Sequence, residues 1–394
     1  MFTKSRTRKN MNRPYKVNNL MVISILIFTG ISGVSNGQPD SSKKLILLLI
    51  GDIMGHKEQI WSAENRENHT YNYDTVFSFI KPVISEADFA VANFEVTMAG
   101  PPYSGYPAFN SPAALAAACK KAGINCLMTA NNHAADRRTK GIKRTIHVLD
   151  SLGISHTGTF SDKDQRDRSY PLFLEKNGIS VALLNYTYGT NGIKVNDPVI
   201  VNTIDNKIIA ADIAEARKKK ADFIIVFLHW GKQYDYITSK SQYDLSEYLF
   251  EQGADLVIGS HPHVLQKMIW GKNSKGGKGN VTYYSLGNFV SNMRKESTGG
   301  GAIARIELLK DNTSARIAHA DYYLTWVYTP IEKYRKRFFV IPCSEYENKP
   351  DFFRDTLQYK KMKKFIFDSR SLLYKQNMNV NEMIYNGSSW LLNY

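Results

Sequence analysis

The sequence is poor in cysteine, with three cysteines among 394 residues. Cys119, Cys126 and Cys343 cannot build a disulfide framework, because such a framework needs several pairs. Cys119 and Cys126 fall in a stretch that passes from a helix pattern to a strand pattern, where small buried thiols are ordinary core residues. A single disulfide is the alternative that remains. The chain is long enough to bury an ample apolar core, so we expect its stability to come from that core.

The first 37 residues contain no acidic residue. Six cations lie within residues 1–19, and an apolar stretch interrupted only by hydroxyl residues and glycine follows at 20–34. A run of about 15 apolar residues after a basic segment is typical of a secretory signal, whereas a spanning helix needs about 20. A clean Ala-x-Ala cleavage site is missing, so an uncleaved N-terminal anchor in residues 1–37 is the alternative. No cysteine follows the stretch, which argues against a lipoprotein anchor. Both alternatives predict export to the periplasm or the cell surface.

Acidic residues are too few to balance the basic ones. The formal net charge is +15, and it falls to +9 when the six N-terminal cations are removed. A basic surface favours anionic partners such as acidic polymers, phosphates or the membrane surface. A nucleic-acid-binding motif is also missing, so we do not expect nucleic acid as a partner. A generally basic proteome would explain the charge equally well.

Internal repeats are absent, and apolar strand patterns alternate with helix patterns instead. Strands are predicted at 45–50, 89–93, 125–129, 180–185, 222–229, 255–259 and 281–285. Helices are predicted near 73–86, 112–122, 140–152, 204–219 and 242–252. Residues 302–309 and 314–324 have the pattern of two antiparallel strands. This alternation indicates an α/β fold class.

The composition changes beyond residue 331. The segments 334–337 and 359–364 are basic and interleaved with aromatic residues. We interpret residues 331–394 as a basic C-terminal extension, mainly helical and packed on the preceding domain. Its basic face is more simply explained as a solvated surface than as a dedicated binding site.

Two histidines separated by one proline follow a predicted strand. The segment Gly259-Ser260-His261-Pro262-His263 comes directly after the apolar run at 254–258. Open α/β sheets bind ligands just beyond the carboxyl ends of their strands. Neutral imidazole is the commonest protein metal ligand. Taken alone, the segment fits a metal site and an ordinary surface turn equally well.

Polar residues also follow the other predicted strands. A single polar residue at such a position often caps the next helix, but a series at the same edge of a sheet indicates a site. Together they offer a mixed set of nitrogen and oxygen ligands that suits Zn, Mn or Fe better than copper or calcium. The predicted metal ligands are Asp52, Glu95, Asn132, His229, His261 and His263.

The polar segments occur in a fixed order between residues 45 and 330. They are Gly51-Asp52-x-Met54, Asn93-Phe94-Glu95, Ala130-Asn131-Asn132-His133-x-x-Asp136, His229-Trp230-Gly231, the stretch 253–263, and Tyr284-Ser285-Leu286-Gly287-Asn288-Phe289. In this order they resemble the motifs of the CapA family of poly-γ-glutamate capsule biosynthesis proteins. That family is similar in fold to calcineurin-like metallophosphoesterases. The resemblance implies a four-layer α/β/β/α sandwich over residues 45–330 and does not extend to residues 331–394.

The resemblance also implies roles for individual residues. The six ligands would hold one or two divalent metal ions, with Glu95 bridging two ions, and His133 would donate a proton to the leaving group. Asp136 either orients His133 or only begins the next helix. Met54 stands where metallophosphoesterases have a histidine ligand, which weakens one metal position. His56 either compensates for that loss or lies in a solvent-facing loop.

Three functions fit these features. The first is an exported metal-dependent hydrolase or transferase of capsule biosynthesis that acts on an anionic polymer. The second is a non-catalytic scaffold that binds the polyanion within the capsule machinery. The third is an extracytoplasmic phosphoesterase unrelated to capsule, because a fold does not fix a function. The expected partners are an anionic polymer or capsule precursor, other capsule-assembly proteins and the membrane surface.

Overall fold

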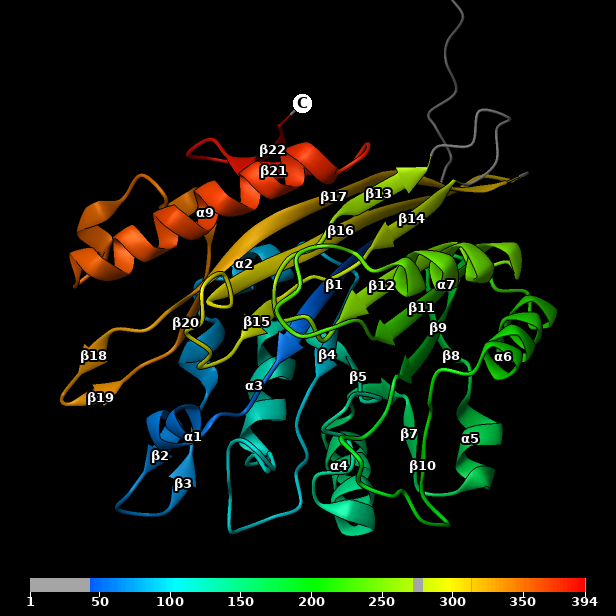
Figure 1. Cartoon of the computed structure of the whole chain (residues 1–394), viewed down its shortest axis with the longest axis horizontal. Coiled ribbons are helices and arrows are strands. Elements are labelled where there is room, and N and C mark those ends of the chain that lie inside the picture. Colours follow the sequence, from blue (N-terminus) through cyan, green and yellow to red (C-terminus); the bar gives the residue numbers. More distant parts are fainter. Residues whose placement is uncertain (1–42, 272–278, 313, 394) are drawn as a thin grey trace, which may run out of the picture. The chain divides into compact units, whose positions relative to one another are not determined.

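Two β-sheets organise the chain in a computed structural model that describes residues 43–271, 279–312 and 314–393 (Figure 1). Residues 42–394 form one compact unit. The predicted signal or anchor in residues 1–37 lies outside the described residues. Within the described ranges, no helix has both the length and the apolar character that crossing a membrane would require.

The larger sheet has ten strands in the described chain. Eight follow the order β22-β21-β17-β16-β1-β4-β5-β6, while β15 pairs with β1 and β20 pairs with β17. Strands β1, β4, β5 and β6 pair in parallel. Strand β16 pairs antiparallel with β1 on one side and with β17 on the other. The strands are β1 (Lys43–Ile53), β4 (Phe89–Phe94), β5 (Ile124–Met128), β6 (Ser155–Thr157), β15 (Asn288–Val290), β16 (Gly300–Lys310), β17 (Ala315–Tyr328), β20 (Phe339–Pro342), β21 (Asn381–Tyr385) and β22 (Trp390–Leu392).

The smaller sheet has six strands in the order β13-β14-β12-β11-β9-β8. Its central strands are parallel, and the two outer strands β8 and β13 are antiparallel. The strands are β8 (Leu172–Lys176), β9 (Ile179–Thr187), β11 (Phe223–His229), β12 (Leu256–Ser260), β13 (Met268–Gly271) and β14 (Asn280–Tyr283). Three two-stranded pairs complete the described strands: β2 (Glu64–Asn65) with β3 (Thr70–Tyr71), β7 (Thr159–Phe160) with β10 (Ile200–Val201), and β18 (Ile331–Glu332) with β19 (Arg335–Lys336).

Alternating side chains of β1 and β11 define the layers. Leu47 and Leu49 belong to an apolar cluster that also contains Ile225 of β11, so this cluster lies between the sheets. Leu48 and its neighbours on the other face of β1 cluster with helices α3 (Ala114–Ala122) and α4 (Arg138–Leu152). On the other face of β11, Val226 clusters with helices α6 (Asn206–Lys218) and α7 (Lys240–Glu251). The order is helix, sheet, sheet, helix, which confirms the predicted four-layer α/β/β/α sandwich.

Strands covered on both faces read as continuous apolar runs, and this explains why the central strands were predictable. One predicted helix is wrong. Residues 73–86 form the 3₁₀ helix η1 (Asp74–Phe77) and the short α2 (Lys81–Ile84) rather than one helix. Pro82 has no N–H to donate to the preceding turn, so a continuous helix would break there. Two further short helices are α1 (Lys57–Ala63) and α5 (Lys163–Ser169).

The three cysteines are free and buried in the apolar clusters. The expectation that Cys119 and Cys126 are core residues is therefore confirmed, and Cys343 is a core residue as well.

The C-terminal extension contains more strand than the sequence predicted. Its main helix, α9 (Thr356–Gln376), packs against β17, and Met362, Phe365 and Leu373 join the cluster between the sheets. Strands β20, β21 and β22 also add to the larger sheet. The segments α8 (Cys343–Tyr346) and η2 (Pro350–Phe352) link them. These short strands depend on β17 as a pairing partner, which is information that local sequence does not carry.

Candidate functional site

The six predicted ligands meet where strands from both sheets end. Asp52 lies on β1, Glu95 follows β4 and Asn132 follows β5, all in the larger sheet. His229 ends β11, and the two histidines at 261 and 263 follow β12 in the smaller sheet. Every one of these side chains is buried. Carboxyl ends of parallel strands share one edge of a sheet, and here the two sheets present that edge to each other.

Two groups of side chains are close enough to share an ion. Glu95, His261 and His263 form one group, and Asp52, Glu95 and His229 form the other; in each, the ligand atoms lie within 4.8 Å of one another. Glu95 belongs to both groups. Glu95 is therefore the one residue through which the two groups are joined.

Asn93 holds the carboxylates in place. Its Nδ2 donates to Asp52 Oδ1 at 2.7 Å and lies 3.4 Å from Glu95 Oε2. Asn93 was not among the site residues predicted from the sequence. Its spacing was the available signal, because residues two apart in an extended segment project to the same side. A bulge in the pairing of β1 at Asp52 accompanies this arrangement.

The contacts of His263 indicate which of its nitrogens is free. Its Nδ1 lies 3.0 Å from Asp52 Oδ2 and 3.0 Å from Asn288 Oδ1. Both partners are oxygen acceptors, so we assign a proton to Nδ1, and Nε2 is the nitrogen left for another contact. Among the described residues, neither His263 Nε2 nor Glu95 Oε1 has a hydrogen-bond partner, although both atoms are buried. Buried acceptors without donors fit the role of metal ligands.

His229 connects the two sheets. Its Nε2 lies 2.8 Å from Asn132 Oδ1 and 3.1 Å from His261 Nδ1, and its Nδ1 lies 3.0 Å from Ser260 Oγ. The same Nε2 is 3.6 Å from Glu95 Oε1. Ser260 was not predicted as part of the site, although it stands next to the predicted His261.

Burial shifts the pKa of three groups in the site. Burial, and then the charge of Asp52, raise the pKa of Glu95 well above its usual value. Burial and the neighbouring histidines lower the pKa of His229, and burial lowers that of His261 to about 3. These two imidazoles are therefore neutral at pH 7, as metal coordination requires. A bound cation is the group that would favour ionisation of Glu95.

His133 and Asp136 form a buried pair beside the ligands. His133 Nδ1 lies 2.7 Å from Asp136 Oδ2, which also accepts the Phe109 N–H at 2.6 Å. Arg137, not Asp136, stands at the start of α4, and that position has no side-chain cap. Asp136 thus contacts the His133 ring and does not cap α4.

A cleft with a volume of about 810 Å³ opens at the site. It is lined by His133, Asp136, Asn132 and His261, together with Tyr188 and Tyr234 from the smaller-sheet side. Tyr188 is half exposed, and its ring centroid is 4.7 Å from that of His261. No pattern in the sequence indicated Tyr188. Trp230, by contrast, packs: its ring stacks on Tyr284, and its Nε1 donates to the Tyr284 carbonyl.

Met54 stands at the position of a histidine ligand in metallophosphoesterases, and His56 lies outside both candidate ligand groups of the described residues. Met54 is buried in the apolar cluster on the helix side of the larger sheet. His56 precedes α1, where its Nδ1 accepts the Asn292 N–H at 3.2 Å. Among the described residues, neither candidate ligand group contains His56.

Replacing His56 by glutamine is expected to make the fold less sensitive to acid. Burial lowers the pKa of His56 from 6.5 to about 4, so its stabilising contribution is complete above pH 6.5 and is lost as the pH falls toward 4. Between pH 7 and 5 the native chain should lose about 2 kcal/mol of unfolding free energy through this group. Urea unfolding of both chains at the two pH values measures it. An equal loss in His56→Gln would contradict the assignment.

The site and the layers together define a four-layer α/β protein with a buried cluster of nitrogen and oxygen ligands at one end of both sheets. Among solved structures, the chain is similar to the NAD nucleotidase of Haemophilus influenzae, with a TM-score of 0.42 and 11% identity over 84% of this chain and 61% of that one. It is also similar to the calcineurin-like phosphoesterase YfkN of Bacillus subtilis, with a TM-score of 0.42 and 12% identity over 84% of this chain and 98% of that one.

Residues 46–293 match the family described as bacterial capsule synthesis protein PGA_cap, and because the match covers more than half of the chain, the chain belongs to that family. It is 28% identical over 329 residues to the capsule biosynthesis protein CapA of Bacillus anthracis, covering 80% of this chain and 77% of that protein. It is 29% identical over 251 residues to the PGA biosynthesis protein CapA of Bacillus subtilis strain 168, covering 61% of this chain and 63% of that protein. The resemblance to the CapA family is thereby confirmed.

Proposed function

We propose that this chain is an exported capsule-biosynthesis protein that binds one or two divalent metal ions and acts on an anionic, poly-γ-glutamate-type polymer. The observation that carries the proposal is the pair of ligand groups that share Glu95 and contain buried acceptors without donors. Membership of the capsule synthesis family supports the biological process.

The donor set fits Zn, Mn or Fe, because it mixes imidazole nitrogens with carboxylate and amide oxygens. Asp52, Glu95, Asn132 and the three histidines would hold the metal, and Met54 leaves one position with fewer ligands. When bound, a divalent ion supplies Lewis-acid polarisation and lowers the pKa of water.

The remaining chemistry belongs to side chains of the cleft. Asp136 accepts from His133 Nδ1 and so fixes the ring, which leaves His133 Nε2 to hold or deliver a proton at a leaving group. Tyr188 and Tyr234 line the entrance to the cleft and would exclude water from a bound chain. A non-catalytic scaffold that binds the polymer at the same metal-containing cleft is the second candidate, and the loss of a ligand at Met54 favours it.

Metal analysis of the purified full-length chain tests the proposal. We expect about one to two ions of Zn, Mn or Fe per chain, and less than a tenth of that in the double variant His261→Ala with His263→Ala. His147 is exposed on α4, so His147→Ala is the matched control and should keep its metal.

The proposal fails if no such metal copurifies or rebinds and the double variant keeps its stability and activity. A hydrolysis screen over phosphoesters and γ-glutamyl polymers then separates the enzyme from the scaffold. Turnover of a polymer that is lost in His133→Asn, with metal retained, identifies the enzyme. Binding without turnover identifies the scaffold, and turnover of phosphoesters alone identifies the phosphoesterase.

A further inference from the structure

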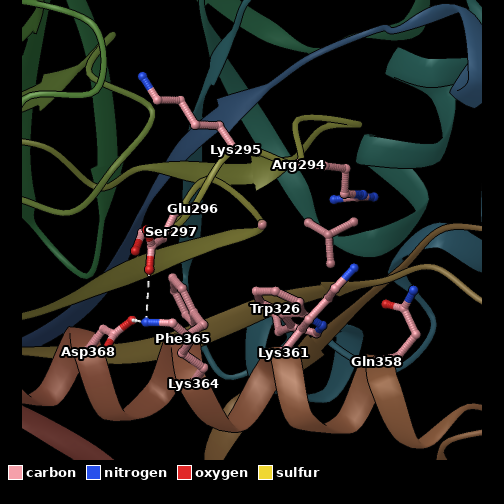
Figure 2. Close-up of a pocket in the computed structure, with 12 residues that line it drawn as sticks. Arg294, Lys295, Glu296, Ser297, Trp326, Gln358, Lys361, Lys364, Phe365 and Asp368 are labelled. Carbon is pink, nitrogen blue, oxygen red and sulfur yellow. Dashed lines mark hydrogen bonds and ion pairs between the residues drawn. The ribbon is translucent and has the colours of Figure 1, made fainter.

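A second pocket lies between α9 and the loop that follows β15, outside the residues of the family match (Figure 2). Its volume is about 320 Å³. Arg294 enters it from the loop, and Lys361 and Gln358 enter it from α9. Figure 2 shows the guanidinium of Arg294, the ammonium of Lys361 and the amide of Gln358 extending into the same space.

The cations of this pocket differ in how they are compensated. Lys364 pairs with Glu296 at 2.8 Å and with Asp368 at 2.7 Å, so its charge is satisfied. Among the described residues, Arg294 and Lys361 have no ion pair with a carboxylate. Glu58 attracts Arg294 without forming such a pair, and it already accepts a hydrogen bond from Asn292. Two uncompensated cations therefore face the pocket.

Neighbouring groups add to this excess of positive charge. Burial and the charge of Arg294 lower the pKa of Lys336, Glu58 raises it, and Lys361 lowers it more weakly. Burial also lowers the pKa of Arg294 to about 10. Like charges gathered in a partly desolvated place are destabilising unless an anion joins them.

One wall of the pocket is apolar. Trp326 is 7% exposed, and its indole Nε1–H has no acceptor among the described residues. Its ring packs against Phe365 with a centroid distance of 5.3 Å. Gly299 allows this arrangement, because a Cβ there would lie 2.6 Å from the Trp326 ring. Trp326 and Phe365 therefore give the pocket an apolar wall.

We propose that this pocket is a carboxylate-binding subsite for the same anionic polymer, an inference that rests on the proposed function. The planar fork of Arg294 matches a carboxylate, Lys361 supplies a second charge, and Trp326 and Phe365 give methylene groups an apolar wall. The loop from β15 also reaches the first cleft, since Lys295 Nζ lies 3.8 Å from the ring centroid of Tyr234. A chain held at Arg294 would thus be directed toward the ligand cluster.

Binding of a defined oligo-γ-glutamate to the purified full-length chain, measured by calorimetry, tests the subsite. Arg294→Gln and Lys361→Gln should each weaken binding about tenfold, because each removes one charge-assisted hydrogen bond. Lys360 is an exposed neighbour on α9 that does not line the pocket, so Lys360→Gln is the charge-matched control and should bind like the native chain. Thermal unfolding of each variant shows whether it is folded.

Equal weakening in Lys360→Gln would overturn the subsite in favour of diffuse electrostatics. Binding of inorganic polyphosphate or anionic phospholipid vesicles, but not of oligo-γ-glutamate, with the same dependence on Lys361 would overturn the carboxylate assignment. The metal content of Arg294→Gln and Lys361→Gln should stay at the native level. Absence of oligomer binding in a chain that keeps its metal would therefore reject the subsite alone, whereas absence of metal in the native chain would reject the proposed function.

Discussion

Replacing Glu95 by glutamine is expected to empty both candidate ligand groups at once. Glu95 is their common member, whereas Asp52 belongs to one group and His261 to the other. Metal content should fall below about a tenth of the native level in Glu95→Gln, because the amide lacks the charge that binds the ion. Asp52→Asn and His261→Ala should each retain part of the metal. Metal analysis of the three purified variants, with His147→Ala as control, measures this order.

The same substitution should raise the stability of the metal-free chain. Burial and Asp52 raise the pKa of Glu95 above its usual 4.5, so the stability that its protonated form contributes below pH 4.5 is lost as the pH rises through the shifted value. Glutamine does not ionise. With chelator at pH 8, the free energy of unfolding of Glu95→Gln should exceed that of the native chain by about 1–3 kcal/mol. This is the range for a buried polar group without a partner.

The advantage of Glu95→Gln should shrink toward pH 4.5 and reverse when metal is added to the native chain. Urea unfolding at pH 4.5 and 8, with and without metal, gives the comparison. A variant that keeps full metal content, or that is less stable than the native chain in chelator at pH 8, would show that Glu95 is a structural carboxylate.

Replacing Gly259 by alanine should produce the largest loss of stability. A Cβ on Gly259 would lie 1.9 Å from the Tyr284 carbonyl oxygen and 2.4 Å from Trp230 Nε1. The first of these is a backbone atom, so the strands must move apart. We expect a loss of about 3 kcal/mol or more in unfolding free energy, at the upper end of the range for overpacking. Because Gly259 lies two residues before His261, metal affinity should fall as well.

Gly189 provides the control for Gly259, because a Cβ there would meet no heavy atom within 4 Å. Gly189→Ala should change the unfolding free energy by less than about 0.5 kcal/mol. Urea unfolding of the two variants makes the comparison. Equal stabilities would show that β12 and the segment after β14 can separate without loss.

The parts of this fold that the sequence predicted are those that local pattern determines. β11 and β12 are apolar runs buried on both faces, and the helices of the two outer layers have clear periodicity. Strand β13 and the pairing of β21 with β17 were not predicted. Each is short, and each depends on a partner that lies elsewhere in the sequence. Pro82 shows the opposite case, where a local rule was available and a helix was still predicted across it.

The site residues also divide into those that local sequence indicates and those that depend on contacts between distant parts of the chain. His261 and Asp52 could be selected from the sequence because each follows or ends a strand pattern at a sheet edge. The contact of His263 with Asp52 joins residues 211 positions apart, and nothing in local sequence indicates it. The same limit explains why Tyr188, which reaches the cleft from the smaller sheet, was not selected.

The turn that carries two of the histidines has a consequence for binding entropy. His261 and His263 both have left-handed backbone conformations, with φ of 99° and 58°, and the proline between them has a fixed φ. Such a backbone persists only where its surroundings over-determine it. The conformational entropy of these residues is lost when the chain folds and not when a ligand binds. An ion bound by His261 and His263 would thus find two imidazoles already in place, and its affinity would not be reduced by the ordering of a flexible loop.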